Sequence, residues 1–198
     1  MRDREQRAKH EKRPPKPLDS TRLHELALSY VARFATSAHK LEQYLQRKLR
    51  ERGWEGDAPP DPAALAQRFA ELGYVDDEAF ARARSASLLR RGYGKRRVNQ
   101  ALGDAGIDAG LRAEVAPGEG AARAAALRLA ERRGLGPFGR DPLGTGMAHR
   151  ARREKQVATL LRAGHSLDIA RNLVDAPSED RARAWAAECD EDDDDALP

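Results

Sequence analysis

Apolar residues recur at helical spacing through most of the chain, and glycines divide that pattern into short segments. The first segment places Leu23, Leu26, Ala27, Tyr30, Val31 and Phe34 on one helical face. The next repeats the pattern with Leu41, Leu45 and Leu49. No run of Val, Ile, Thr and Tyr alternates with polar residues as a strand would require. The sequence therefore predicts an all-α protein.

Five segments end with the same signal, which is an apolar residue, three spacers, a glycine and a second apolar or aromatic residue. The glycines are Gly53, Gly73, Gly92, Gly106 and Gly164. This spacing is typical of a Schellman motif, in which glycine takes the left-handed position after the helix and the next residue folds back onto the first apolar side chain. The predicted contacts are Phe69 with Tyr74, Leu88 with Tyr93 and Leu102 with Ile107. A weaker copy of the signal occurs at Ala130, Gly134 and Leu135.

A helix start lies between the stops at Gly73 and Gly92. Asp76 is suited to cap the helix, and Asp77 and Glu78 place negative charge on its first turn. Val75 and Phe80 stand at the positions of a hydrophobic staple. One helix therefore ends and the next begins within about three residues, as expected in a compact helical core.

The stops also repeat on a larger scale. Gly53, Gly106 and Gly164 are 53 and 58 residues apart, and each precedes a polar cap candidate (Asp61, Asp108 or Ser166) and a short helix. This period predicts three divergent repeats of three helices each. Glycine stops are also common in helical proteins without repeats, but five with a matching apolar pair favour the repeat interpretation.

The sequence predicts three repeats that are flanked by two terminal segments, with a loop inside the third repeat. Residues 1–18 are a disordered basic segment, 19–75, 76–117 and 118–176 are the three repeats, 134–146 is a Gly/Pro loop, and 177–198 is a polar and acidic tail. The positions predicted to face inward in the middle helices are Leu65, Phe69, Leu72, Phe80, Ala83, Ser87, Leu88, Val98, Leu102, Leu111, Val115, Leu127 and Leu129.

Composition argues against a metal site, a disulfide and a membrane span. Cys189 is the single cysteine, and none of the five histidines recurs four residues from another. No stretch approaches eighteen apolar residues, and the basic N-terminus lacks an apolar signal region. We expect a soluble, cytoplasmic protein without cofactor or metal.

No motif supports catalysis. Residues 134–139 spell the glycine fingerprint of dinucleotide-binding proteins, but a predicted helix precedes them and Pro137 interrupts them, whereas the fingerprint works only after a strand. Capping explains Asp76 and Asp77 better than acid–base chemistry does. No serine or cysteine has the context of a nucleophile, so the protein is predicted not to be an enzyme.

Charge is unevenly distributed. Seven acidic residues lie between Glu188 and Asp195, and the remaining 36 basic and 25 acidic residues give a net charge of +11. A basic cluster precedes a glycine stop in each repeat: residues 40–52, then Arg90, Arg91, Lys95, Arg96 and Arg97, then Arg150, Arg152, Arg153 and Lys155. A solvated helix face explains any one cluster. Three in equivalent positions suit a phosphate backbone or an acidic protein groove, for which the acidic tail would compete.

The central part of the chain resembles a known family. The run from Leu72 to Arg82, followed by residues 92–102 and Gly106-Ile107, is similar to the central signature of the RecX family, bacterial regulators of the RecA recombinase. The signature residues are Gly73, Tyr74, Asp76, Asp77, Phe80, Gly92, Gly94, Leu102 and Gly106. The resemblance extends from about Leu23 to Val174. Lys40, Ala101 and His165 depart from it, where the family usually has an acidic residue, Glu and Phe.

The resemblance implies a non-enzymatic, monomeric modulator. Family members form an elongated, curved array that lies in the groove of the RecA–DNA filament, where it limits filament growth and inhibits recombinase, ATPase and coprotease activities. The residues alone support only helical repeats and a basic surface. Two alternatives therefore stay open, which are a helix-turn-helix-like regulator that acts directly on single- or double-stranded DNA, and a helical adaptor without a nucleic-acid role.

Overall fold

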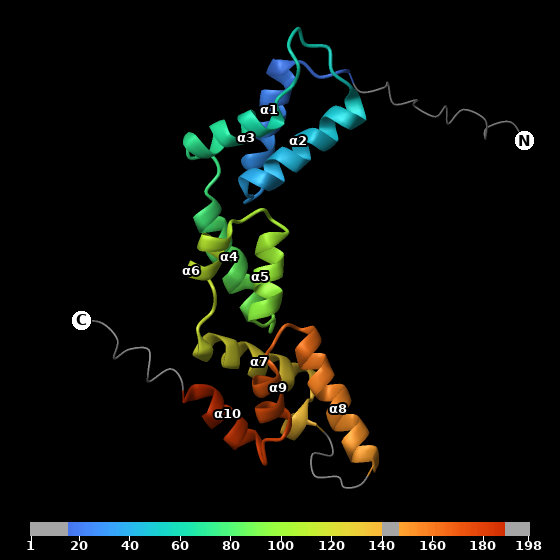
Figure 1. The fold of residues 1–198 in the computed structure, drawn as a ribbon, viewed down its shortest axis with the longest axis vertical. Helices are drawn as coiled ribbons and strands as arrows, with labels where there is room; N and C mark the ends of the chain where they lie inside the picture. Colours follow the sequence, from blue (N-terminus) through green and yellow to red (C-terminus); the bar gives the residue numbers. More distant parts are fainter. Residues whose placement is uncertain (1–15, 140–146, 189–198) are drawn as a thin grey trace, which may run out of the picture. The chain divides into compact units, whose positions relative to one another are not determined.

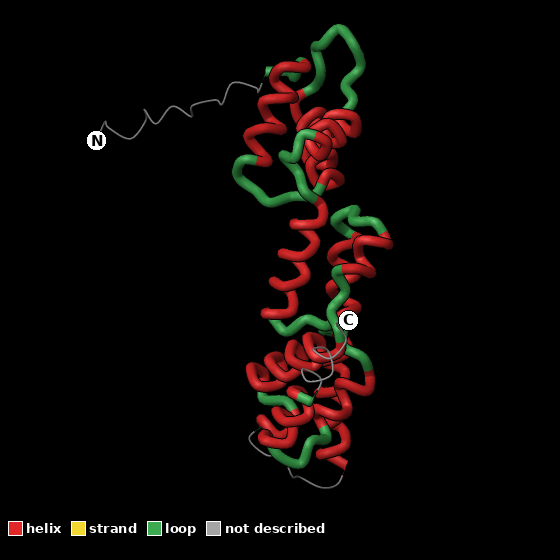
Figure 2. Tube along the Cα trace, turned by 90° about the vertical axis from the view of Figure 1, so that its left-hand side faces the viewer, coloured by secondary structure: helices red, strands yellow, loops and turns green. Residues whose placement is uncertain are grey.

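A computed structural model describes residues 16–139 and 147–188. These residues form ten α-helices and one short 3-10 helix, and contain no strand beyond an isolated bridge (Figures 1 and 2). The chain divides into two compact units, one ending at Val75 and one beginning at Asp76. The all-α prediction is confirmed. The rest of the basic N-terminal segment, the end of the Gly/Pro loop and the acidic run lie outside the described residues.

The first unit consists of α1 (Ser20–Val31), α2 (Ala38–Arg52) and α3 (Pro62–Glu71). Asp19, Ser37 and Asp61 cap the three helices by accepting a hydrogen bond from a first-turn N–H. Its core consists of Leu18, Leu23, Ala27, Leu41, Leu45, Ala66, Phe69 and Val75.

Two predictions for this unit were wrong at the helix ends. Phe34 and Leu72 are 56% and 51% exposed, because α1 ends at Val31 and Leu72 is the C-cap of α3. Conversely, Leu18 was assigned to the disordered segment but is fully buried. Its N–H donates to the Gly53 carbonyl at 3.0 Å, and its carbonyl accepts from the Glu55 N–H at 2.8 Å. The folded unit therefore begins earlier than predicted.

The second unit begins with α4 (Asp77–Arg90), α5 (Lys95–Gly103) and α6 (Ala109–Glu114). Their core cluster comprises Ala81, Leu88, Val98, Leu102, Ala105, Ile107 and Val115. The predicted stripe on α4 is confirmed at Leu88 and Phe80, which belong to or pack against this core, but it was wrong at Ala83. Ala83 is exposed, and Ser85 is buried instead. The Ser85 hydroxyl donates to the Val115 carbonyl at 3.3 Å, which satisfies its polar group inside the core.

The rest of the second unit contains α7 (Glu119–Arg133), η1 (Gly136–Phe138), α8 (Met147–Arg162), α9 (Leu167–Val174) and α10 (Glu179–Ala187). Alanines make much of its core, since Ala122, Ala126 and Ala130 of α7 pack with Leu160, Ile169 and Leu173. This burial exceeds the prediction for α7, which covers only Leu127 and Leu129. Residues 177–188 are predicted to belong to a tail, but α10 packs Ala182 into this core and also buries Ala186.

The glycine stops have the predicted geometry, with one exception. All five predicted glycines and Gly134 have positive φ. After Gly73, Gly92, Gly106, Gly134 and Gly164, the next residue donates its N–H to the carbonyl five residues earlier, at 2.9–3.2 Å. The predicted Phe69–Tyr74 contact is confirmed by ring centroids 5.4 Å apart. At Gly53 the backbone becomes extended instead, with ψ 177°, and the chain continues into the bridge between Leu18 and Trp54.

Candidate partner-binding surface

The basic residues of the second unit lie around one helix–turn–helix junction. Arg90 ends α4, Arg91 is its C-cap, and Lys95, Arg96 and Arg97 form the first turn of α5. The Schellman turn at Gly92 and the N-cap at Gly94 reverse the chain between the two helices. All five cationic residues are exposed. We refer to these five residues as the junction cluster.

The junction packs against the end of α8 through its backbone. Gly94 donates its N–H to the Ala163 carbonyl at 2.9 Å, and Arg96 donates its N–H to the Gly164 carbonyl at 3.1 Å. His165, which is 3% exposed, places Nε2 3.0 Å from the Gly92 carbonyl oxygen. Because a carbonyl oxygen only accepts, Nε2 carries the hydrogen. The first turn of α5 is therefore held on one side by residues 163–165.

The members of the junction cluster differ in their contacts. The Arg96 guanidinium donates to the Leu161 carbonyl at 2.8 Å and so caps the last turn of α8. Arg91 lies 5.3 Å from the centre of the Tyr93 ring, and Arg97 donates to the Gln100 amide oxygen at 3.0 Å. Within the described residues, Lys95 and Arg90 have no ion pair. Arg96 therefore serves the fold, while the side chains of Lys95, Arg97 and Arg90 are exposed to solvent.

The basic residues of α8 divide in a similar way. Arg150, Arg152 and Lys155 are exposed, as predicted. Arg153 instead forms a bidentate pair with Asp175, which follows α9, and also contacts Glu154. Its hydrogen bond to Asp175 raises the pKa of Arg153 above its ordinary value. Arg153 therefore ties α8 to the end of α9.

The structure brings these two sets of residues onto adjoining elements. The junction cluster contacts α8 at Leu161 and the residues that follow, and Lys155 precedes Leu161 by about 9 Å along the helix axis. Both sets belong to the second compact unit. The basic residues of α2 belong to the first unit, where Arg47 and Lys48 pair with Glu51.

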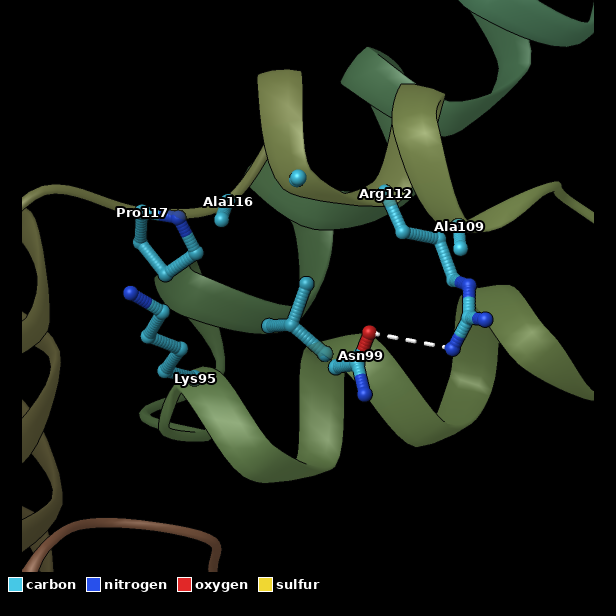
Figure 3. Close-up of a pocket in the computed structure, with 8 residues that line it drawn as sticks. Lys95, Asn99, Ala109, Arg112, Ala116 and Pro117 are labelled. Atoms are coloured by element: carbon cyan, nitrogen blue, oxygen red, sulfur yellow. Dashed lines mark hydrogen bonds between the residues drawn. The ribbon is translucent and has the colours of Figure 1, made fainter.

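A small cavity beside Lys95 was not foreseen from the sequence. It encloses about 290 Å³ between α5 and α6, and Figure 3 shows Lys95 and Arg112 at its opposite ends. Arg112 donates to the Asn99 side-chain oxygen at 3.2 Å. The spacing of Lys95 and Asn99 places both on one face of α5, which the sequence does indicate. Arg112 comes from another helix, and no sequence period links it to Lys95.

The other signature residues have structural roles. Gly73, Gly92 and Gly106 form the turns, Asp76 caps α4 through a 2.8 Å bond from the Ala79 N–H, and Leu102 is fully buried. Val75 belongs to the core of the first unit and Phe80 packs against the cluster of α4, α5 and α6. The signature therefore specifies the fold more than a binding site.

In the ranges 16–139 and 147–188, no group of three or more His, Cys, Asp or Glu is placed to hold a metal ion. None of the helices described there has the length and apolar character needed to span a membrane.

These features define an all-α protein of tandem three-helix units with a basic surface on its second compact unit. Residues 76–115 match the family described as "RecX, second three-helix domain". The chain is also similar to "Regulatory protein RecX" of Myxococcus xanthus (strain DK1622), with 31% identity over 170 residues, covering 82% of this chain and 89% of the relative. The chain belongs to the RecX family and is a RecX-type regulatory protein.

A solved structure supports the same fold. The crystal structure of RecX from Lactobacillus salivarius superposes with a TM-score of 0.59 at 17% sequence identity, covering 77% of this chain and 92% of that chain. At this identity the likeness concerns the fold. It agrees with the tandem three-helix arrangement predicted from the glycine stops.

Proposed function

We propose that this protein binds the RecA–DNA filament and limits its growth, and thereby lowers the recombinase, ATPase and coprotease activities of RecA. Membership of the RecX family supports the assignment. The observation that carries it in the structure is the exposed charge of Lys95 and Arg97 at the start of α5, beside the exposed Arg150 and Lys155 of α8. A nucleoprotein filament presents phosphates and acidic side chains that such a surface can contact.

The exposed basic side chains contribute little to the stability of the fold, so a role in partner binding is the better explanation for them. An exposed charge contributes little to folding stability, whereas a surface charge accelerates encounter with an oppositely charged partner. Arg96 and Arg153 are excluded from this set by their contacts with Leu161 and Asp175. We therefore assign partner binding to Arg90, Lys95, Arg97, Arg150 and Lys155.

The proposed regulator acts by binding alone. We expect a monomer without ATPase or nuclease activity of its own. A block at the growing end of a filament affects every subunit that would have been added later, so inhibition is expected below one regulator per recombinase subunit.

The helix-turn-helix alternative is disfavoured by the packing of α5. A recognition helix contacts base edges with its N-terminal residues. Here the first turn of α5 is bonded to Ala163 and Gly164, and the Arg96 side chain reaches Leu161. These contacts place residues 161–164 directly beside the turn, where they restrict its entry into a major groove. The second compact unit is therefore better suited to a partner that contacts the solvent-exposed side of α5.

Binding to immobilised single-stranded DNA, with and without RecA and a slowly hydrolysed ATP analogue, tests the proposal. We expect retention on the coated DNA and much weaker retention on bare DNA. If about four phosphates are contacted directly, the slope of log K against log salt should be near −3, from roughly 0.7 per contact. Sequence-dependent binding to bare DNA would support the helix-turn-helix alternative, and no retention on either would support the adaptor.

A further inference from the structure

The cavity between α5 and α6 has positive ends and an apolar floor. Its described lining consists of Lys95, Val98, Asn99, Ala109, Arg112, Ala113, Ala116 and Pro117, and includes no acidic residue. Arg112 donates to the Asn99 side-chain oxygen at 3.2 Å and to the Asp108 backbone carbonyl at 3.3 Å. Both acceptors are neutral, so these contacts orient the guanidinium without neutralising it. The cavity suits a segment that is acidic and has a small apolar side.

The direction of α10 brings the following chain toward this cavity. Arg183 on α10 pairs with Glu131 of α7 at 3.1 Å, and two residues later the Trp185 carbonyl accepts from Arg123 at 3.1 Å. As α10 advances, its contacts on α7 move back toward the start of α7, so the two helices run antiparallel (Figure 1). The helix α7 begins at Glu119, and Pro117, which lines the cavity, comes two residues before it.

The chain after α10 has the matching chemistry and sufficient length. The sequence from Asp190 to Asp195 is entirely acidic and is followed by Ala196 and Leu197. The contact at Arg123 lies about 9 Å along α7 from the level of Pro117. An extended chain spans roughly 3.3 Å per residue, so about three residues after Glu188 cover this distance.

We propose that the acidic segment Asp190–Asp195 docks across the cavity between Lys95 and Arg112. A second cavity, beside Arg171 and Arg181, is less suitable because Asp175 is part of its lining. The docking is independent of the proposed function. Its regulatory consequence rests on that function, since a docked tail covers Lys95 and competes with the partner.

Paramagnetic relaxation in the full chain tests the docking without any partner. A nitroxide is attached at Leu197→Cys in the Cys189→Ser background, and amide signals of the ¹⁵N-labelled protein are compared before and after reduction of the label. We expect broadening at Lys95, Asn99, Ala109 and Ala113 at low salt. Because screening weakens the attraction, the broadening should fade at about 0.5 M salt.

Charge variants provide the matched control. Lys95→Glu should remove the broadening from α5 and α6, while Arg84→Glu, which reverses an exposed charge on α4, should leave it in place. The same spectra report whether each variant is folded, and Arg112→Gln provides a second test of the cavity. Broadening centred on Arg171 and Arg181, or confined to the end of α10, would overturn the proposal. Because RecA is absent, this outcome is separate from failure of the proposed function.

Discussion

Gly94 and Gly164 approach each other so closely that neither position has room for a side chain. A Cβ atom on Gly94 would lie 2.5 Å from the carbonyl carbon and oxygen of Gly164, and one on Gly164 would lie 2.5 Å from the Arg97 nitrogen. These glycines belong to the signature turn before α5 and to the stop after α8, 70 residues apart in the chain. Their contact fixes the junction cluster against the end of α8.

Replacing Gly94 by alanine should destabilise the second unit. The backbone at Gly94 has φ −88°, which any residue adopts, so the cost comes from the clash with Gly164. Overpacking of this kind costs about 1–3 kcal/mol. Urea unfolding measures the change. Gly103→Ala is the matched control, since a Cβ there would meet only the flexible Arg112 side chain at 3.4 Å. Equal stabilities of the two variants would contradict the close contact.

Burial of His165 should make stability depend on pH. Desolvation lowers the pKa of His165 below its ordinary value of 6.5, although its bond to the Gly92 carbonyl partly opposes the shift. Protonation would place an N–H on Nδ1, which is buried and has no hydrogen-bond partner among the described residues. The stability from the neutral ring is therefore fully present above pH 6.5 and is lost as the pH falls toward the lower folded pKa.

The variant His165→Phe isolates this contribution. Phenylalanine keeps an aromatic ring in the core but does not titrate, so the unfolding midpoint should fall less steeply as the pH drops below 6.5. Urea titrations at several pH values provide the measurement. Parallel pH profiles for the two proteins would show that His165 does not carry the dependence.

Removing α10 should be far more damaging than removing the acidic run. A chain ending at Ala176 loses the buried Ala182 and Ala186 and the stacking of Arg123 on Trp185, whose ring centre is 4.5 Å away. A loss of about 2 kcal/mol would lower Tm by roughly 4–8 °C in a chain of this size. A chain ending at Glu188 should keep nearly the full Tm, because exposed charges contribute little. Equal losses would mean that α10 is not part of the core.

The junction cluster should separate into structural and binding residues. Arg96→Ala removes the bond to the Leu161 carbonyl and should cost about 0.5–1 kcal/mol of stability. The double variant Lys95→Ala/Arg97→Ala should keep its stability but bind the recombinase filament about three- to tenfold more weakly. Thermal unfolding and retention on filament-coated DNA measure the two properties. Loss of stability in the double variant without loss of binding would reverse the assignment.

The parts of the fold that depend on neighbouring residues were predictable from the sequence. The positive φ of Gly73, Gly92 and Gly106 follows from the Schellman spacing, and the caps Asp61, Asp76 and Asp108 follow from their position before an apolar run. Both signals lie within one helical turn. The type of these helices and the turns between them therefore needed no knowledge of tertiary contacts, whereas α10 was not predicted.

What was missed depends on contacts between distant residues. The burial of Ser85 is possible because its hydroxyl donates to the Val115 carbonyl, 30 residues away. Leu18 is held in the core because its backbone N–H and carbonyl bond to the backbone of Gly53 and Glu55. The candidate surface shows the same difference between features set by neighbouring residues and features set by distant contacts. Its exposed cations were predictable from charge and helical spacing, whereas the structural role of Arg96 depends on a carbonyl 65 residues away.

The rate of ATP hydrolysis by RecA on single-stranded DNA tests the central claim most directly. The measurement adds this protein at increasing ratios below one per recombinase subunit, at fixed salt and saturating ATP. Our account predicts a rate that falls progressively at substoichiometric ratios, and a weaker effect from Lys95→Ala/Arg97→Ala. A rate that is unchanged at equimolar protein would contradict the account.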